Sequence, residues 1–273
     1  RRLEKSADGW VAGLVLMLEK AAGGGVVPER KGTRTPEEIV DYFGGEVFGQ
    51  VNPETRTFLL GSSFLPRMTA EMAERLTGNA RAGEILSGLC RNNWFTQAHG
   101  RDEPVYEYHS LFREFLLSRA KTVLPAEEIT RLQRTAAGLL AEKGLAEDAA
   151  VLLRECGDWD GLARIALSLA PSLAGQGRYL TLEGWLRALP PIVLEATPWL
   201  PYWLGVCRMP FNPNESVPLF EIAFHEFRKK SDPAGVFLAW AGVVDSIFFS
   251  HHDLSLLDPW IDLVMRPWTM TRG

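Results

Sequence analysis

The segment WFTQAHGRDEPVYEYHSLFREFL, residues 94–116, decides the fold class of this chain because the spacing of its apolar residues changes within it. Two short runs, Trp94–Thr96 and Val105–Tyr108, have the aromatic and β-branched content of strands, and the polar stretch 99–104 separates them. From Ser110 onward the apolar residues follow helical spacing, and this serine is a candidate cap for the helix. Because short helices precede the segment, the order of elements predicts a winged helix.

Start and stop signals predict three helices ahead of that segment. Asn52-Pro53-Glu54 opens the first, because asparagine accepts hydrogen bonds from free helix amides and proline fits the first turn. Thr69 caps the second, which Gly78 ends, and the third spans Ala80–Arg91. Further upstream, Thr35-Pro36-Glu37-Glu38 has the form of a capping box and begins another helix.

Beyond Pro125 the pattern is purely helical. Each predicted helix is short and apolar on one side, and glycine or proline interrupts the pattern between neighbours. Such hairpins bury their apolar faces only by stacking, so the sequence predicts a helical-repeat solenoid, TPR-like but without a clean tetratricopeptide signature. The fold class is therefore mainly α, a winged-helix module with one small β-hairpin followed by this solenoid. The predicted helices are Glu127–Lys143, Leu145–Glu155, Trp159–Leu173, Leu180–Leu189, Trp199–Arg208, Val217–Lys229, Val236–Phe249 and one near Leu254–Met265.

Composition and charge exclude some classes of function. The chain is 46% hydrophobic and 23% charged, as is usual for a globular protein. Its net charge of -5 and pI near 5.7 lack the basic footprint of a nucleic-acid binder. The turn 100–103, which would form the wing, has more acidic than basic residues. Charge therefore argues against DNA binding through the winged helix, an alternative that a salt-dependent mobility shift would reveal.

Three further observations concern the cellular setting. Cys90, Cys156 and Cys207 are isolated and odd in number, which favours reduced thiols and a cytoplasmic location. The longest apolar runs, such as Trp10–Leu18, fall short of the ~20 residues that cross a bilayer, and no signal peptide is evident, so we expect no membrane partner. Because the chain begins at Arg1 within an amphipathic pattern, we expect it to be a piece of a longer protein.

A search for catalytic constellations finds none. A P-loop needs a Gly-Lys dipeptide, which never occurs in the chain, and the GxSxG elbow is absent. Carboxylate pairs such as Glu127/Glu128 and Glu147/Asp148 fall in the first turns of predicted helices, where they favour the helix dipole. We therefore expect that the chain is not an enzyme.

One cluster has side chains of metal-binding type, His251-His252-Asp253. Adjacent residues of a helix point in different directions, and no HExxH accompanies them, so we interpret the cluster as a polar helix end. His225 has Phe224 and Phe227 as close neighbours, which favours a core or rim histidine over a ligand. We expect no metal and no cofactor in this chain.

The nine tryptophans follow helical spacing on apolar faces, which makes core packing the first interpretation. For Trp199, Tyr202 and Trp203 there is a second one, in which the three aromatic side chains line a concave ligand groove on the repeats. Both interpretations stay open for these residues.

One histidine has a distinctive position. His109 follows the second strand-like run and precedes the helix Leu111–Leu117. A helix N-terminus has unpaired amides and a partial positive charge, so an imidazole there is well placed to donate to a phosphate oxygen. Chemistry alone favours the simpler alternative, a histidine that caps its own loop.

These residues, taken in order, resemble a known family. The ordered motifs are GWVAGL at 9–14, IVDYF at 39–43, FLLGSS at 58–63, YHSLFREFL at 108–116, GDW at 157–159 and WLRALP at 185–190. The series is similar to the large LuxR-type, MalT-like transcriptional regulators, which belong to the STAND class of signal-transduction ATPases. The resemblance covers the chain to about Pro190 and is weaker beyond that residue.

The resemblance implies a domain layout: a P-loop ATPase module, a small helical lid, a winged helix, a helical-repeat sensor and a C-terminal DNA-binding helix-turn-helix. On that template, residues 1–22 end the lid, 23–34 are a linker, 35–124 form the winged helix and 125–273 form the TPR-like sensor region. The ATPase core, an intramolecular partner, and the DNA-binding domain lie outside the chain. ATP or ADP is then implied for the full-length protein and not for this chain alone.

The resemblance also implies a role for His109. In STAND proteins a winged-helix histidine contacts the β-phosphate of the nucleotide and helps to hold the closed, ADP-bound state, and His109 lies at the matching motif. The lid motif Gly9-Trp10-Val11 commonly has proline in third place, so Val11 puts an adenine contact there in doubt.

Two functional hypotheses follow. In the first, the winged helix latches the nucleotide-bound state, and the repeats receive a small-molecule inducer or a regulatory protein. In the second, the chain is a helical-repeat interaction scaffold with no ligand and no nucleotide role. Calorimetry against metabolites and candidate partner proteins would separate the two hypotheses.

Overall fold

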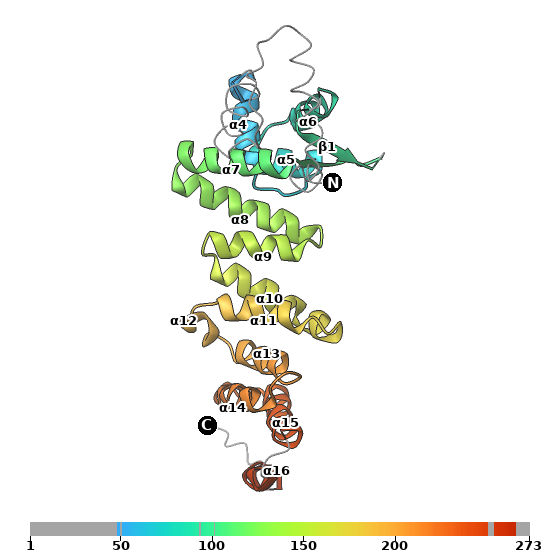
Figure 1. The fold of residues 1–273 in the computed structure, drawn as a ribbon. Coiled ribbons are helices and arrows are strands. Elements are labelled where there is room, and N and C mark those ends of the chain that lie inside the picture. Colours follow the sequence, from blue (N-terminus) through green and yellow to red (C-terminus); the bar gives the residue numbers. More distant parts are fainter. Residues whose placement is uncertain (1–47, 50, 93, 101, 251–253, 266–273) are drawn as a thin grey trace, which may run out of the picture.

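The described part of the chain is a column of helices with the small hairpin at one end (Figure 1). The computed structural model describes residues 48, 49, 51–92, 94–100, 102–250 and 254–265. The predictions for the lid, the linker, the capping box at 35–38 and Val11 lie outside the described residues.

The winged-helix end has the predicted order of elements. Asn52 precedes the first helix and its Oδ1 accepts from Thr55 N at 2.8 Å. Thr69 Oγ1 accepts from Met72 N at 3.2 Å, and Gly78 ends that helix with φ of 73°, a value that glycine adopts without strain. These start and stop signals are confirmed. The elements are α4 (Pro53–Ser62), α5 (Ala70–Thr77), α6 (Ala82–Arg91), β1 (Thr96–His99), β2 (Val105–Tyr108) and α7 (Ser110–Val123).

Strand β2 is held on both sides. It pairs antiparallel with β1, from Thr96 opposite Tyr108 to His99 opposite Val105. On its other edge, Met68 exchanges two backbone hydrogen bonds with Tyr106, at 2.9 and 2.7 Å. The Tyr108 hydroxyl lies 2.8 Å from Ser62 Oγ of α4, and the Tyr106 hydroxyl lies 3.1 Å from Ser87 Oγ of α6. The hairpin is therefore fixed to two helices by its aromatic side chains as well as by its backbone.

Two details of the predicted hairpin are wrong. The first strand begins at Thr96 and not at Trp94, because Phe95 has a left-handed φ of 47°, which does not continue a strand. Ser110 is not the cap of α7 but its first residue; His109 occupies the cap position, and its side chain makes no capping hydrogen bond.

Beyond the winged helix, antiparallel helices stack along the column (Figure 1). Consecutive helices pack on one another from α7 to α11 and from α13 to α15, and α11 packs on α13 past the short α12. In addition α10 packs on α13 and α13 on α15, which is the pattern of stacked hairpins. The helices are α8 (Ala126–Glu142), α9 (Ala146–Glu155), α10 (Trp159–Gly175), α11 (Tyr179–Ala188), α12 (Pro191–Leu194), α13 (Trp199–Arg208), α14 (Pro213–Lys229), α15 (Pro233–Phe249) and α16 (Asp258–Met265), with the 3-10 turn η2 (Leu254–Leu257) before α16.

Prolines account for the main differences from the predicted helices. Helix α14 begins at Pro213, four residues before the predicted start, and it contains Pro218. The short helix α12 begins at Pro191, although the pattern predicts that prolines lie between helices. The predicted helix near Leu254–Met265 is divided into the 3-10 turn η2 and α16, and Pro259 lies in the first turn of α16, where the missing N–H of proline costs no helical hydrogen bond.

One apolar core runs from the winged helix into the repeats. Buried residues from Val51 to Cys207 form a single cluster. At the surface of this joint, Arg75 of α5 makes a two-point ion pair with Glu142 of α8, with distances of 2.7 and 3.0 Å. The winged helix and the first repeat helices are thus packed together. No helix in the described ranges is both long enough and apolar enough to cross a membrane.

Candidate functional site

His109 lies where β2 turns into α7. Its backbone N–H donates to Phe95 O at 2.8 Å, and its carbonyl accepts from Arg113 N at 2.9 Å, the first bond of the helix. The imidazole meets the Phe95 ring edge to face, with the ring centres 6.5 Å apart. The strand, the loop before it and the helix together therefore determine where this side chain lies.

The imidazole has an unmet hydrogen bond. Nδ1 of His109 is buried, and within the described structure it has no partner. A buried polar atom without a partner costs about 1–3 kcal/mol, so a native structure that keeps one calls for an explanation. The side chain as a whole is only half-buried, so part of the ring remains within reach of a ligand.

The start of α7 is also the right electrostatic setting for an anion. The amides of Ser110 and Leu111 precede the first helical bond, and the side chain at the cap position, His109, makes no capping hydrogen bond within the described structure. The first turn of α7 has no acidic residue, whereas α9 has Glu147 and Asp148 in its first turn. The positive end of the α7 dipole is therefore not neutralised by its own side chains.

Arg113, one turn further along α7, fixes the helix in place. Its Nε donates to Ser63 O at 2.8 Å, at the end of α4. Burial lowers the pKa of this guanidinium, while nearby carboxylates, Glu155 first among them, act to raise it. Arg113 thus anchors α7, and with it His109, to the body of the winged helix.

The three aromatic residues of the predicted groove lie together, but far from His109. Rings of Trp199 and Trp203 flank Tyr202, with centres 5.5 and 5.3 Å away. Trp199 also packs on Phe227 of α14 at 4.8 Å. Burial raises the pKa of the Tyr202 hydroxyl. The half-buried Trp199 and Tyr202 pack between α13 and α14, whereas Trp203 packs against the core that runs from the winged helix to α13. Helices α8–α11 separate all three from α7. A ligand role for them stays a prediction.

Other candidate residues are easily placed. His225 is exposed beside Phe224, with ring centres 5.5 Å apart, which is a rim position. His251-His252-Asp253 lies outside the described residues. Within the described ranges, no three His, Cys, Asp or Glu side chains gather in a way that would hold a metal ion.

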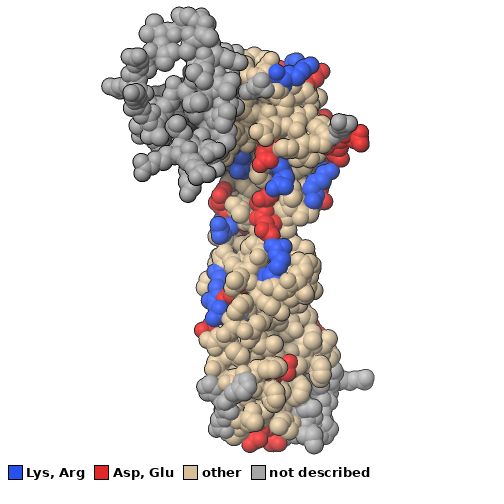
Figure 2. Space-filling view, turned by 45° about the vertical axis from the view of Figure 1, so that its right-hand side comes forward, with Lys and Arg blue, Asp and Glu red and all other residues tan. Residues whose placement is uncertain are grey.

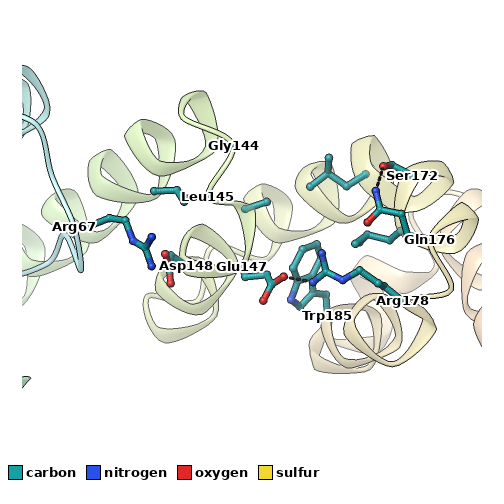
Figure 3. Close-up of a pocket in the computed structure, with 12 residues that line it drawn as sticks. Arg67, Gly144, Leu145, Glu147, Asp148, Ser172, Gln176, Arg178 and Trp185 are labelled. Atoms are coloured by element: carbon teal, nitrogen blue, oxygen red, sulfur yellow. Dashed lines mark hydrogen bonds and ion pairs between the residues drawn. The ribbon is translucent and has the colours of Figure 1, made fainter. Parts of the chain in front are cut away.

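The sequence did not reveal a cleft of about 400 Å³ between the winged helix and the first repeats. Arg67 reaches it from the loop before α5, and Glu147, Asp148 and Arg178 reach it from α9 and the turn before α11 (Figure 3). These residues are distant in sequence, and the two acidic ones had an adequate explanation in the helix dipole. No pattern in the sequence indicates that these residues lie together in the folded chain.

Comparisons with known proteins agree with the winged helix. Residues 44–128 match the family described as the MalT winged helix domain. Over 203 residues the chain is 30% identical to the HTH-type transcriptional regulator MalT of Cronobacter sakazakii (strain ATCC BAA-894), a match that covers 73% of this chain and 22% of that protein. The chain thus spans about a fifth of the length of the curated relative that it matches.

Proposed function

The chain is MalT-like and contains a MalT winged helix domain, and from this premise we propose that it is the regulatory and sensor part of a transcriptional regulator. In this proposal the winged helix latches onto a nucleotide-loaded ATPase core elsewhere in the longer protein. The helical repeats receive an inducer or a regulatory protein, and DNA is contacted only through a separate domain.

The observation that carries the proposal is the unpartnered Nδ1 of His109 at the uncapped start of α7. A phosphate oxygen would supply the missing partner, because a protonated ring nitrogen donates to it and the amides of Ser110 and Leu111 at the start of α7 add further donors. The absence of first-turn carboxylates in α7 removes the repulsion that an anion would meet at α9.

The proposed switch works through differential binding. Contact between His109 and the β-phosphate of ADP favours the closed state, in which the winged helix lies against the ATPase core. A signal that binds the repeats better in the open state shifts the population towards it. The winged helix and α8 share a core, so a movement of the repeats would be passed to the winged helix without an intervening flexible joint.

The test is the rate of ADP release from a longer protein that carries this chain with its ATPase core. A hydrogen bond to a charged group contributes about 1.5–3 kcal/mol, so His109→Ala should release ADP roughly ten- to a hundred-fold faster. His99→Ala is the matched control, because His99 is exposed on β1 and belongs to the same hairpin. Equal release rates for His109→Ala and the unsubstituted protein would refute the proposal.

One observation favours the scaffold as a second candidate. On the face seen in Figure 2, charged side chains thin out towards the end that carries α13–α16. Large apolar side chains such as Phe237, Phe248 and Ile261 are about half exposed or more on α15 and α16. Binding of a partner protein to the repeats, with no response to nucleotide in the longer protein, would support this candidate instead.

A further inference from the structure

The cleft at the joint has walls from two parts of the fold (Figure 3). Arg67 enters from the winged helix, in the loop that precedes α5. The other side consists of the turn before α9 and the facing sides of α10 and α11. A volume of about 400 Å³ lies within the range of small-molecule sites.

Two of the four charges in the cleft are already paired. Arg178 makes an ion pair with Glu147, and Gln176 donates to Ser172 Oγ at 3.0 Å on the same wall. The side chains of Arg67 and Asp148, in contrast, make no hydrogen bond and no ion pair within the described part of the chain, although burial lowers the pKa of Arg113 and the Asp148 carboxylate is close enough to act to raise it. Figure 3 shows the Arg67 guanidinium directed towards the Asp148 carboxylate without reaching it. Among the described residues, the cleft therefore offers one cation and one anion that no hydrogen bond or ion pair occupies.

An apolar surface lies next to these charges. Trp185, Leu169 and Leu173 line the same cleft, on the side of α10 and α11. The net charge of the four charged side chains is zero. A simple anion would be repelled by Glu147 and Asp148, and a simple cation would be repelled by Arg67 and Arg178. A ligand that carries both charges and an apolar group satisfies all of these features at once.

We propose that this cleft binds a small zwitterion, an α-amino acid or a dipeptide with an apolar side chain. Its carboxylate lies on the Arg67 guanidinium, its ammonium group lies on the Asp148 carboxylate, and its side chain lies against Trp185. Guanidinium and carboxylate form strong two-point hydrogen bonds, which gives the ligand a defined orientation.

The position of the cleft gives such a ligand a regulatory role, and this part rests on the proposed function. A bound zwitterion contacts the winged helix through Arg67 and the repeats through Asp148. Asp148 is also among the carboxylates that act to raise the pKa of Arg113, which burial lowers, so its charge acts on α7, the helix that follows His109. The ligand would thus hold together the two parts whose relative position the switch uses.

The binding test uses calorimetry on the 273-residue chain. The probes are L-leucine, L-methionine, L-tryptophan and the dipeptide leucyl-leucine, each compared with N-acetyl-leucine and leucinamide, which lack the ammonium and the carboxylate respectively. We expect saturable binding of at least one zwitterion, with both blocked derivatives at least about ten-fold weaker. Tighter binding of the dipeptide than of leucine identifies the longer ligand within the same class. No binding by any zwitterion, or equal binding of N-acetyl-leucine, overturns the proposal.

Matched variants separate a local effect from a loss of structure. Arg67→Gln and Asp148→Asn should each weaken binding about ten-fold or more, because each removes one charged contact. Arg164→Gln and Asp160→Asn are the controls: both residues are exposed on α10, and Asp160 lies in a first turn as Asp148 does. Controls that weaken binding as much as the cleft variants also overturn the proposal. Failure here leaves the His109 proposal standing, because ADP release tests that proposal separately.

Discussion

Gly235 on α15 lies against the ring of Phe227 on α14. A Cβ added at Gly235 would lie 2.2 Å from the nearest ring carbon of Phe227, far inside contact distance. Phe227 has no exposed surface, and its ring centre lies 4.8 Å from that of Trp199, so the ring has little room to move away. Gly235→Ala therefore forces α14 and α15 apart or pushes Phe227 into Trp199.

The expected size of the effect follows from two opposing terms. Overpacking of a filled core costs about 1–3 kcal/mol and occasionally more. Alanine is preferred over glycine inside a helix by about 1 kcal/mol, which offsets part of that loss. Because the approach is so close, we expect the high end of the range, a net loss of about 2 kcal/mol in the free energy of unfolding.

The assay is urea unfolding followed by circular dichroism, with Gly184→Ala as the matched control. Gly184 is exposed inside α11, and a Cβ there meets nothing within 4 Å, so alanine should stabilise the chain by up to about 1 kcal/mol. Opposite shifts of the two urea midpoints are expected. If Gly235→Ala is as stable as Gly184→Ala, the packing of α15 on α14 is not as described.

Two other predictions concern buried groups. Tyr108→Phe removes the 2.8 Å hydrogen bond to Ser62 and should lower the free energy of unfolding by about 1 kcal/mol, measured by urea unfolding; an unchanged midpoint would contradict the proposed attachment of the hairpin to α4. Burial, and then Glu183, raises the pKa of the Cys207 thiol from 9.0 to about 12. The folded chain therefore holds this proton more tightly than the unfolded chain, so the stabilisation is complete below pH 9 and is lost as the pH rises towards 12. The decline of stability above pH 9 should be shallower in Cys207→Ala, and in the native chain Cys207 should react with a thiol reagent at pH 8 more slowly than the half-buried Cys156; equal rates would contradict its burial.

Much of the fold could be predicted because its signals are local. Asn52, Thr69 and Gly78 act on backbone groups within a few residues of themselves, so their helix ends were identified from sequence alone. Helix α13 has the predicted bounds, Trp199–Arg208. The start of β1 was missed because the left-handed backbone of Phe95 depends on tertiary packing, since propensity favours strand for an aromatic residue.

The site could be predicted only in part. His109 could be identified from its place between a strand and a helix. That its Nδ1 is buried without a hydrogen-bond partner depends on tertiary packing, which residue spacing does not reveal. The same holds for the cleft, where Arg67 and Asp148 come together only because α8 packs on α5 and α7 of the winged helix and α9 packs on α8. In the sequence, Asp148 is explained as a carboxylate in the first turn of a helix. Only its position beside Arg67 in the folded chain indicates a role in ligand binding.

The central claim is that the winged helix completes a nucleotide site built by another part of a longer protein. The most direct test is to purify that protein and the 273-residue chain without added nucleotide, denature both, and quantify the released ADP by chromatography. The account predicts ADP close to one per longer protein and none from the chain alone, which lacks the Gly-Lys of a P-loop. Absence of ADP from both preparations would contradict the role assigned to His109 and leave the scaffold as the better description.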